Sequence, residues 1–587
     1  MSLTHVKGPE PAEIGSREHA LARLWAQAEE RSDQVILKSP ADQGWNEMTW
    51  SDLVENVRSL AAGLVAAGVE SGDRVGLMSP TRVEWTLADL GILAAGAITV
   101  PLYDTSSADQ VRGILSDAGA RLVIVADSDL ADRVREVSDA EIVVIDDGDL
   151  DGLRRRGGAA EHDEADRRRD ALTTDDVATI VYTSGTTGDP KGCVLTHGNV
   201  AWTIRQTRDY LDDVLGQGGS LLQFLPLAHI FARLIQFVCL DSNVTVGFPE
   251  SPQDPRDDIR SFQPTLLLGV PRVFEKVFEA ARRQASGPVK KAMFNAAVST
   301  AQATSMAERP GPVLRARRAV ADRLVYAKLR NALGGHVRYC VSGGAPLSTD
   351  LAHFYRGAGV PIFEGYGLTE TTAPATVNVP DAVRVGSVGR PLPGVEVRID
   401  DGEILVKGRN VFERYFHEDG RNDEDFDGEW FRTGDLGELD DDGFLFVRER
   451  KKELIVTASG KNIAPAPLEN AISSHELVSQ AMLVGDQKRF VAALVTLDED
   501  EARSFAKKHD LPDDTSALKE DETVRAEVQQ AIDEANQKVS RAESIREFVI
   551  LDREFTERDG ELTPTMKLRR RDIAEHFADE IDSIYAA

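Results

Sequence analysis

The chain has 587 residues, of which 42% are hydrophobic and 28% are charged, and its formal net charge at pH 7 is −30. This length exceeds what one hydrophobic core serves, so we expect two or more globular domains. The negative charge would repel a phosphate backbone and argues against nucleic-acid binding. Cys193, Cys239 and Cys340 are far apart and form no C-x-x-C pair. This pattern predicts neither a disulfide framework nor a zinc site and favours a reducing cytoplasm.

The N-terminal 20 residues lack the apolar core of a signal peptide. The most apolar stretch, Leu90–Tyr103, contains glycines and Pro101 and is too short to span a bilayer. We therefore expect a soluble, cytoplasmic protein, or one that rests on the inner face of a membrane.

Helical and strand patterns alternate through the first 180 residues. Trp50–Ala67 carries apolar side chains at helical spacing, and Ser51 is the expected N-cap. Arg74–Met78 and Leu122–Val125 are nearly all apolar and predict buried strands. Such strands between amphipathic helices indicate parallel sheets covered on both faces. The charged segment Leu153–Asp170 is expected to be an exposed connector.

A loop rich in glycine and threonine, Tyr182–Gly192, follows the strand-like run Val177–Val181. Glycines let backbone N–H groups approach phosphate oxygens, hydroxyls donate further hydrogen bonds, and a lysine adds positive charge. The spacing does not fit a Walker A loop. We interpret the loop as a polyphosphate-binding site, and a solvated turn is the alternative. Its candidate binding residues are Thr183, Ser184, Gly185, Thr186, Thr187, Gly188 and Lys191.

Residues 281–340, the basic segment, depart from the acidic character of the chain. The segment contains 12 lysine and arginine residues against Glu308 and Asp322, a local charge of +10. It is either a solvated face neutralised by acidic neighbours or a docking surface. The docking partner would be a phosphorylated ligand such as coenzyme A, or anionic lipid headgroups at a membrane. The sequence does not separate these alternatives.

Three further segments carry glycine and polar residues, and two of them follow strand-like runs. Ser342–Pro346 follows Val337–Val341, and Gly365–Glu370 follows Pro361–Phe363. The second of these loops offers an aromatic face on which a purine can stack and a carboxylate that can bind Mg²⁺. Trp430–Asp435 supplies an aspartate that can accept hydrogen bonds from both hydroxyls of a diol. Each motif alone would also fit an ordinary turn.

The charged run Val447–Val456 lies between two strand-like segments and is the natural domain boundary. About 130 residues follow it, including the strand-like runs Val491–Leu497 and Phe548–Leu551, which is enough for a small domain. We expect an α/β protein in which residues 1–449 form a large N-terminal domain of parallel-rich sheets covered by helices. Residues 450–587 would form a small, mobile α+β domain.

Together these segments resemble the adenylate-forming superfamily over most of the chain, and within it the bacterial long-chain fatty-acid–CoA ligases. Supporting segments are Gln223–Phe231, Pro264–Val277, Gly460–Pro465 and Gly560–Arg571. The resemblance implies an enzyme that activates a fatty acid with ATP, releases pyrophosphate, and passes the acyl group from an acyl-adenylate to coenzyme A. AMP is the second product.

The resemblance also implies roles for single residues. Tyr366 would pack on adenine, and Glu370 with Thr183 would bind Mg²⁺. Lys452 would be the hinge, and Lys567 would stabilise charge as the carboxylate attacks the α-phosphate. Implied ATP contacts besides the loop are Gly344, Ala345, Gly365, Tyr366, Gly367, Leu368, Thr369, Asp435 and Arg450, the last two at the ribose. The acyl or coenzyme A region would include His229, Phe231, Gly460, Lys461 and Asn462.

Alternative functions share these motifs. A fatty-acyl-AMP ligase would deliver the acyl group to a carrier protein, but it would carry an insertion at the domain junction, and no extra segment is obvious near Arg450. A luciferase-like oxidative enzyme would use the same ATP site. A catalytically silent lipid-binding homologue is the remaining alternative, because a fold does not by itself imply an activity.

Overall fold

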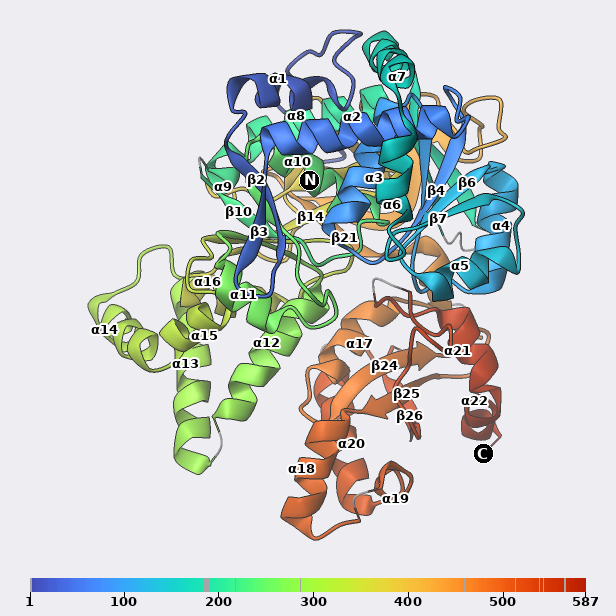
Figure 1. Cartoon of the computed structure of the whole chain (residues 1–587). Helices are drawn as coiled ribbons and strands as arrows, with labels where there is room; N and C mark the ends of the chain where they lie inside the picture. Colours follow the sequence, from blue (N-terminus) through green and yellow to red (C-terminus); the bar gives the residue numbers. More distant parts are fainter. Residues whose placement is uncertain are drawn as a thin grey trace. The chain divides into compact units, whose positions relative to one another are not determined.

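The structure is a computed structural model and describes residues 3–183, 190–216, 218–285, 287–458, 461–512, 514–537, 539–541, 543–563 and 566–586. The chain divides into two compact units (Figure 1). Unit 1 comprises residues Met1–Thr433 and Glu438–Phe446, and unit 2 comprises Gly434–Gly437 and Val447–Ala587. No helix in the described ranges is long and apolar enough to cross a membrane.

The first sheet of unit 1 has the strand order β7-β6-β4-β5-β8-β9. Neighbouring strands are parallel except β8 and β9, which form an antiparallel pair. The strands are β4 (Arg74–Met78), β5 (Ile98–Leu102), β6 (Leu122–Val125), β7 (Glu141–Val144), β8 (Val177–Thr183) and β9 (Lys191–Thr196). The accompanying helices are α2 (Trp50–Ala66), α3 (Val83–Ala94), α4 (Ala108–Ala118), α5 (Ser128–Arg135), α6 (Asp149–Arg156) and α7 (Ala159–Ala171).

Two details of this region differ from the sequence prediction. The N-cap of α2 is Thr49 rather than Ser51, because the Thr49 hydroxyl accepts the Asp52 N–H and the Asp52 carboxylate accepts the Thr49 N–H. The segment Leu153–Asp170 is not a connector: it lies within α6 and α7. Its charges support the helix, since Glu164 pairs with Arg168 one turn later, and α7 packs on α2.

The second sheet of unit 1 has nine strands in the order β16-β15-β14-β13-β12-β10-β11-β2-β3. Its central strands are parallel, and its antiparallel pairs are β2–β3, β14–β15 and β15–β16. The strands are β2 (Val35–Pro40), β3 (Trp45–Thr49), β10 (Ser220–Leu222), β11 (Thr245–Gly247), β12 (Leu266–Gly269), β13 (Tyr339–Ser342), β14 (Ile362–Leu368), β15 (Ala373–Val377) and β16 (Arg390–Pro391). The expected parallel-rich α/β architecture is confirmed.

The helices of this part of unit 1 include a group that extends away from the sheets, α12 to α15 (Figure 1). That group comprises α12 (Pro271–Gln284), α13 (Pro288–Met306), α14 (Pro312–Ala321), the π-helical turn η1 (Asp322–Tyr326) and α15 (Ala327–Ala332). Nearer the sheets lie α1 (Ala22–Glu30), α8 (His197–Tyr210), α9 (Asp212–Leu215), α10 (Ile230–Asp241), α11 (Arg256–Phe262), α16 (Thr349–Ala358) and the short turn η2 (Thr369–Thr371).

A third sheet contains β1 (His5–Lys7), β17 (Glu396–Asp400), β18 (Glu403–Lys407), β20 (Trp430–Leu439) and β19 (Phe426–Asp427), in that spatial order. The chain enters unit 2 briefly within β20, at Gly434–Gly437, and enters it again at Val447 within β21 (Leu445–Arg450).

Unit 2 is built on the three-stranded sheet β24 (Val478–Val484), β25 (Val491–Leu497) and β26 (Ile545–Ile550). Side chains of β25 alternate between two cores: Val491, Ala493 and Val495 face one, and Ala492 and Leu494 face the other. The remaining elements are η3 (Lys451–Glu453), β22 (Ile455–Val456), β23 (Asn462–Ile463), α17 (Pro465–Ser473), α18 (Glu499–His509), α19 (Thr515–Leu518), α20 (Glu522–Asn536), α21 (Arg570–His576) and α22 (Ala578–Tyr585). This unit therefore has a hydrophobic interior of its own.

Candidate active site

The predicted phosphate loop joins the antiparallel strands β8 and β9. Thr183 and Lys191 are partners at the end of this ladder, so the loop leaves and rejoins the sheet at one point. The other loop candidates, Ser184, Gly185, Thr186, Thr187 and Gly188, lie outside the described residues.

Tyr415 links Lys191 to Glu370, two residues that the sequence placed in separate motifs. The Tyr415 hydroxyl donates to Glu370 Oε1 at 2.9 Å, and Lys191 Nζ lies 4.8 Å from the centroid of the Tyr415 ring. Backbone contacts hold this arrangement, because Tyr415 bridges to Cys193 on β9 and the Phe412 N–H donates to the Glu370 carbonyl. A carboxylate, an ammonium group and the end of the phosphate loop thus gather around one ring.

Burial and the nearby Glu370 carboxylate raise the pKa of Tyr415 well above its ordinary value. The phenol therefore keeps its proton at physiological pH and serves as a hydrogen-bond donor. A donor on one carboxylate oxygen restricts the orientation of Glu370 while leaving acceptor capacity for a cation. The sequence analysis missed Tyr415.

The motif Gly365–Glu370 differs from the expected loop. Gly365, Tyr366, Gly367 and Leu368 continue strand β14 and pair with β15, and only Thr369 and Glu370 enter the turn η2. Gly367 is required by this pairing, because a side chain there would overlap the Ala373 carbonyl oxygen. The structure therefore places Tyr366 in strand β14, opposite Thr376 of β15, rather than in a loop.

Glu364, immediately before this motif, connects it to the segment Ser342–Pro346. Its carboxylate is buried and accepts the N–H of Leu347 at 3.2 Å. Desolvation raises the pKa of Glu364 to about 7. The connected segment exposes Gly344 and Ala345, and Gly344 has the positive φ of +83° that favours glycine.

His229 and Phe231 lie at the start of α10. The His229 ring caps the helix by accepting the Phe231 N–H at 3.2 Å. The Phe231 ring lies against Gly343, where an added side chain would approach the ring to 3.1 Å. These two residues of the expected acyl region therefore lie next to the Ser342–Pro346 segment.

In unit 2, Asp435 and Arg450 are brought together. Arg450 Nε donates to Asp435 Oδ1 at 3.1 Å, and the Asp435 side chain is buried while that of Arg450 is partly exposed. Lys452 lies in the short turn η3 that follows Arg450. The buried aspartate can accept hydrogen bonds from the hydroxyls of a neutral diol, and the partly exposed guanidinium can bind a negative charge next to that diol.

The Gly460–Pro465 segment forms the returning half of a small hairpin, with Val456 opposite Asn462. Lys461 Nζ pairs with Glu543 at 3.2 Å. Gly460 lies outside the described residues, and the position of the Asn462 side chain is likewise outside them.

Lys567 lies on a tight turn before α21. Its N–H donates to the Thr563 hydroxyl at 3.0 Å, its carbonyl accepts the Thr563 N–H at 2.8 Å, and its side chain is exposed. Leu562 and Leu568 bridge across the turn. A lysine displayed in this manner can reach a ligand while its backbone stays fixed.

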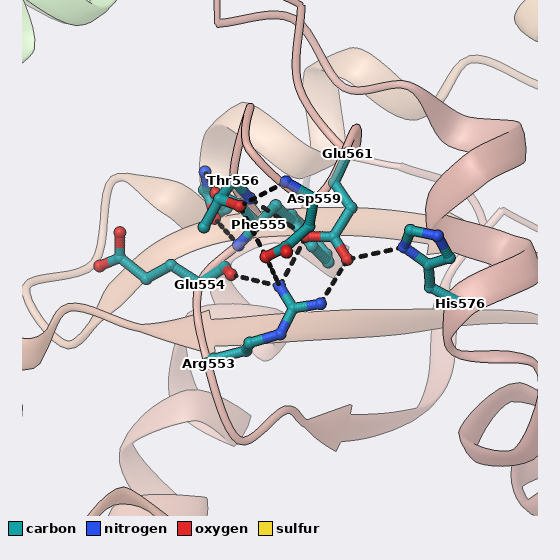
Figure 2. Close-up of polar contacts among 8 residues, drawn as sticks. Arg553, Glu554, Phe555, Thr556, Asp559, Glu561 and His576 are labelled. Atoms are coloured by element: carbon teal, nitrogen blue, oxygen red, sulfur yellow. Dashed lines mark hydrogen bonds and ion pairs between the residues drawn. The ribbon is translucent and has the colours of Figure 1, made fainter. Parts of the chain in front are cut away.

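A polar network anchors this turn at Glu561 (Figure 2). Arg553 donates to both carboxylate oxygens of Glu561 at 2.6 Å, and His576 Nδ1 lies 3.0 Å from Glu561 Oε1. The Thr556 N–H adds a further hydrogen bond. Burial raises the pKa of Glu561, but the hydrogen bonds from Arg553 and His576 outweigh it, so the pKa is lower than usual. The carboxylate thus stays ionised, and sequence patterns did not identify it.

Comparisons with known proteins agree with this arrangement. Residues 24–416 match the family described as AMP-binding enzyme, and residues 452–587 match the AMP-binding enzyme C-terminal domain. The chain belongs to this family, which confirms the predicted membership of the adenylate-forming superfamily.

Among its relatives is the long-chain-fatty-acid–CoA ligase FadD15 of Mycobacterium bovis, which is 44% identical over 99% of this chain and 100% of that protein. The human long-chain-fatty-acid–CoA ligase ACSBG1 is 30% identical over 94% of this chain and 83% of its own length. ATP-bound MatB from Rhodopseudomonas palustris shares the fold, with a TM-score of 0.71, 24% identity and coverage of 96% of this chain and 99% of that one. A Mycobacterium tuberculosis fatty acyl-CoA synthetase gives a TM-score of 0.63 at 23% identity, covering 96% and 99% of the two chains.

Proposed function

We propose that this protein is a long-chain fatty-acid–CoA ligase that forms acyl-CoA through an acyl-adenylate. The observation that carries the proposal is the cluster of Lys191, Tyr415 and Glu370 at the end of the β8–β9 ladder. It supplies a cation for phosphate oxygens and a fixed carboxylate for a metal ion beside a predicted phosphate loop. The full-length similarity to long-chain-fatty-acid–CoA ligases supports the choice of substrate class.

In the first half-reaction, the fatty carboxylate attacks the α-phosphate of ATP and pyrophosphate leaves. We assign the grip on the β- and γ-phosphates to the loop from Thr183 to Lys191, and the adenine contact to Tyr366. Glu370 and Thr183 offer the oxygen ligands that Mg²⁺ prefers. Bound Mg²⁺ would neutralise charge on the phosphate oxygens. The protein itself contributes positioning and electrostatic stabilisation.

We assign to unit 2 the contacts with the ribose and the mobile, positively charged side chain of Lys567. Asp435 and Arg450 would bind the ribose, and Lys567 would stabilise the negative charge that develops at the α-phosphate. We place the hinge between the half-reactions at Lys452 and the coenzyme A contact at the hairpin that contains Lys461. This division gives one enzyme two successive active arrangements.

The half-reactions provide the test. Lys567→Ala should abolish fatty-acid-dependent ATP–pyrophosphate exchange while leaving thiolysis of supplied acyl-AMP by coenzyme A near the wild-type rate. Lys507→Ala, which changes an exposed lysine of α18, is the matched control. Equal loss of both half-reactions in Lys567→Ala would contradict the assigned role.

A panel of fatty acids of graded length separates the alternative functions. With ATP and coenzyme A, the wild-type protein should release AMP and acyl-CoA, most rapidly with long chains. Acyl-AMP without thioester would favour the fatty-acyl-AMP ligase. Absence of pyrophosphate release with every acid would favour the silent lipid-binding homologue.

The basic segment, residues 281–340, is assigned to an anionic partner at the periphery of the protein. Its local charge of +10 stands against −30 for the whole chain. Phosphates of coenzyme A and a membrane surface both satisfy this charge requirement.

A further inference from the structure

Large apolar side chains that face solvent gather in the helices of the basic segment. Between α13 and η1 these are Val289, Met293, Met306, Val313, Val320 and Leu324, and elsewhere in the described chain only Leu3 and Met566 are comparable. Val289 and Val313 are more than 70% exposed. Scattered single residues of this kind need no explanation, but exposed apolar side chains that share one face of a helix can form an interaction site.

The apolar residues of α14 and η1 follow a helical stripe. Val313 and Val320 are seven residues apart and Leu324 follows four later, so the three lie on one side of the helix. At the C-terminal end of this stretch, Ala321 and Tyr326 are buried, and the Tyr326 hydroxyl donates to the Ala297 carbonyl. The stripe therefore faces solvent on a helical stretch that is anchored to the protein at its C-terminal end.

Three exposed arginines of the same helical stretch lack an acidic partner among the described residues. Arg315, Arg317 and Arg323 are exposed, and none of them forms an ion pair with an acidic side chain in the described ranges. Asp322, the acidic residue of η1, pairs with Arg330 at 2.8 Å. These three arginines are therefore available to an anionic partner.

We propose that the basic-apolar surface of α14 and η1, formed by Val313, Val320 and Leu324 with Arg315, Arg317 and Arg323, docks the protein onto a bilayer that contains anionic lipids. Aliphatic side chains enter the headgroup region while the guanidinium groups contact lipid phosphates. Coenzyme A phosphates would use the arginines but would leave the exposed valines without a role. A protein partner would have to offset this positive surface charge with acidic residues of its own. The experiment below distinguishes such a partner from a bilayer.

Docking onto a bilayer would serve the proposed ligase activity, and its biological purpose rests on that proposed function. Long-chain fatty acids partition into bilayers, so an enzyme held at the bilayer meets its acid where that acid is concentrated. Docking itself requires neither ATP nor coenzyme A. Its failure can therefore be measured separately from a failure of the ligase activity.

Co-flotation of the full-length protein with vesicles tests the proposal. One set of vesicles contains phosphatidylcholine alone, and the other contains roughly one third phosphatidylglycerol. We expect binding to the anionic vesicles only, weakened by added salt. The double substitution Val313→Ser and Val320→Ser should weaken binding about tenfold. The triple substitution Arg315→Gln, Arg317→Gln and Arg323→Gln should weaken it more strongly, at about fivefold for each arginine.

Matched variants control for net charge and for general apolar exposure. Arg256→Gln with Arg260→Gln changes exposed arginines of unit 1 outside the surface, and Leu3→Ser changes an exposed leucine elsewhere. Both should bind vesicles as the wild type does. Acyl-CoA synthesis in vesicle-free solution should be unchanged in all variants, which confirms that they fold.

Four results would overturn the proposal. The wild type could fail to bind anionic vesicles, or it could bind them with no loss in the valine variant. Alternatively, the arginine variant could raise the KM for coenzyme A with no change in vesicle binding, which would assign the surface to coenzyme A. Vesicle binding that appears only when a second protein is added would assign the surface to a protein partner.

Discussion

At the residue scale, Tyr415 offers the sharpest test of the candidate active site. Tyr415→Phe removes the hydroxyl that donates to Glu370 but keeps the ring beside Lys191. Loss of a hydrogen bond to a charged group should slow acyl-adenylate formation about tenfold or more. Because Glu370 is the proposed metal ligand, the Mg²⁺ concentration needed for half-maximal pyrophosphate exchange should also rise.

The control for this change is Tyr326→Phe. It deletes another buried hydroxyl of unit 1, one that donates to the Ala297 carbonyl in the α12–α15 helical group. Its Mg²⁺ dependence should match that of the wild type. A Tyr415→Phe protein with lower activity but an unchanged Mg²⁺ dependence would contradict the positioning role and indicate only a loss of stability.

Glu364 predicts a pH dependence of stability. Its pKa rises from the ordinary 4.5 to about 7 in the folded protein, so the folded state holds the proton more tightly than the unfolded state does. The stability that this group contributes is complete below pH 4.5 and is lost as the pH rises to about 7. Glu364→Gln, which does not titrate, should therefore gain about 2 to 3 kcal/mol relative to the wild type between pH 5 and pH 8.

Chemical denaturation of both proteins at the two pH values measures this difference. The same comparison at Glu29, an exposed glutamate of α1, provides the baseline. A difference between Glu364→Gln and the wild type that stays constant with pH would show that the Glu364 carboxyl does not hold its proton as described.

At the scale of elements, the turn that carries Lys567 depends on the Glu561 network. Glu561→Gln removes the charge that binds Arg553 and His576, which should destabilise unit 2 by about 2 kcal/mol. It should also loosen the Lys567 turn, because the Arg569 N–H is held by the Glu561 carbonyl in the same structure. Acyl-adenylate formation should therefore fall several-fold more than thiolysis of supplied acyl-AMP.

Glu575→Gln is the matched control, because it breaks the exposed pair with Arg571 on the same helix. An exposed pair contributes little, so both half-reactions should stay near wild-type rates. Equal slowing of the two half-reactions by Glu561→Gln would assign the network to general stability alone.

Sequence patterns predicted those elements whose apolar residues are continuous along a strand or recur at helical spacing. Val491–Leu497 is a strand with the expected bounds, and the helix that begins at Trp50 was also predicted. The strand character of Gly365–Leu368 was not, because two glycines argue against a strand unless a neighbouring chain approaches closely, as Ala373 does at Gly367. Helix α7 was missed because its stability comes from ion pairs and packing on α2.

The residues of the candidate site likewise divide into those that local patterns could predict and those that they could not. Thr183, Lys191 and Glu370 belong to local motifs and could be named from the sequence. Tyr415 could not, because its hydrogen bond to Glu370 joins residues 45 positions apart. Contacts across such separations are set by the pairing of β9 with the 412–416 segment, which no local pattern encodes.

At the scale of the whole molecule, each unit has its own hydrophobic core, and this predicts separable unfolding. Leu494 is fully buried in the sheet of unit 2, and Leu77 is fully buried in the first sheet of unit 1. Each leucine-to-alanine change should cost about 2 to 5 kcal/mol, but only in the unit that contains it. Thermal unfolding should show two transitions, with Leu494→Ala lowering one and Leu77→Ala lowering the other.

Limited proteolysis assigns each transition to its unit through the fragments that appear as the temperature rises. Leu494→Ala should release fragments of residues 447–587 at a lower temperature while fragments of residues 1–433 appear as in the wild type. A single transition that both substitutions lower equally would contradict independent cores. It would also weaken the proposed mechanism, because a unit that turns about Lys452 between two half-reactions must keep its own fold while its surroundings change.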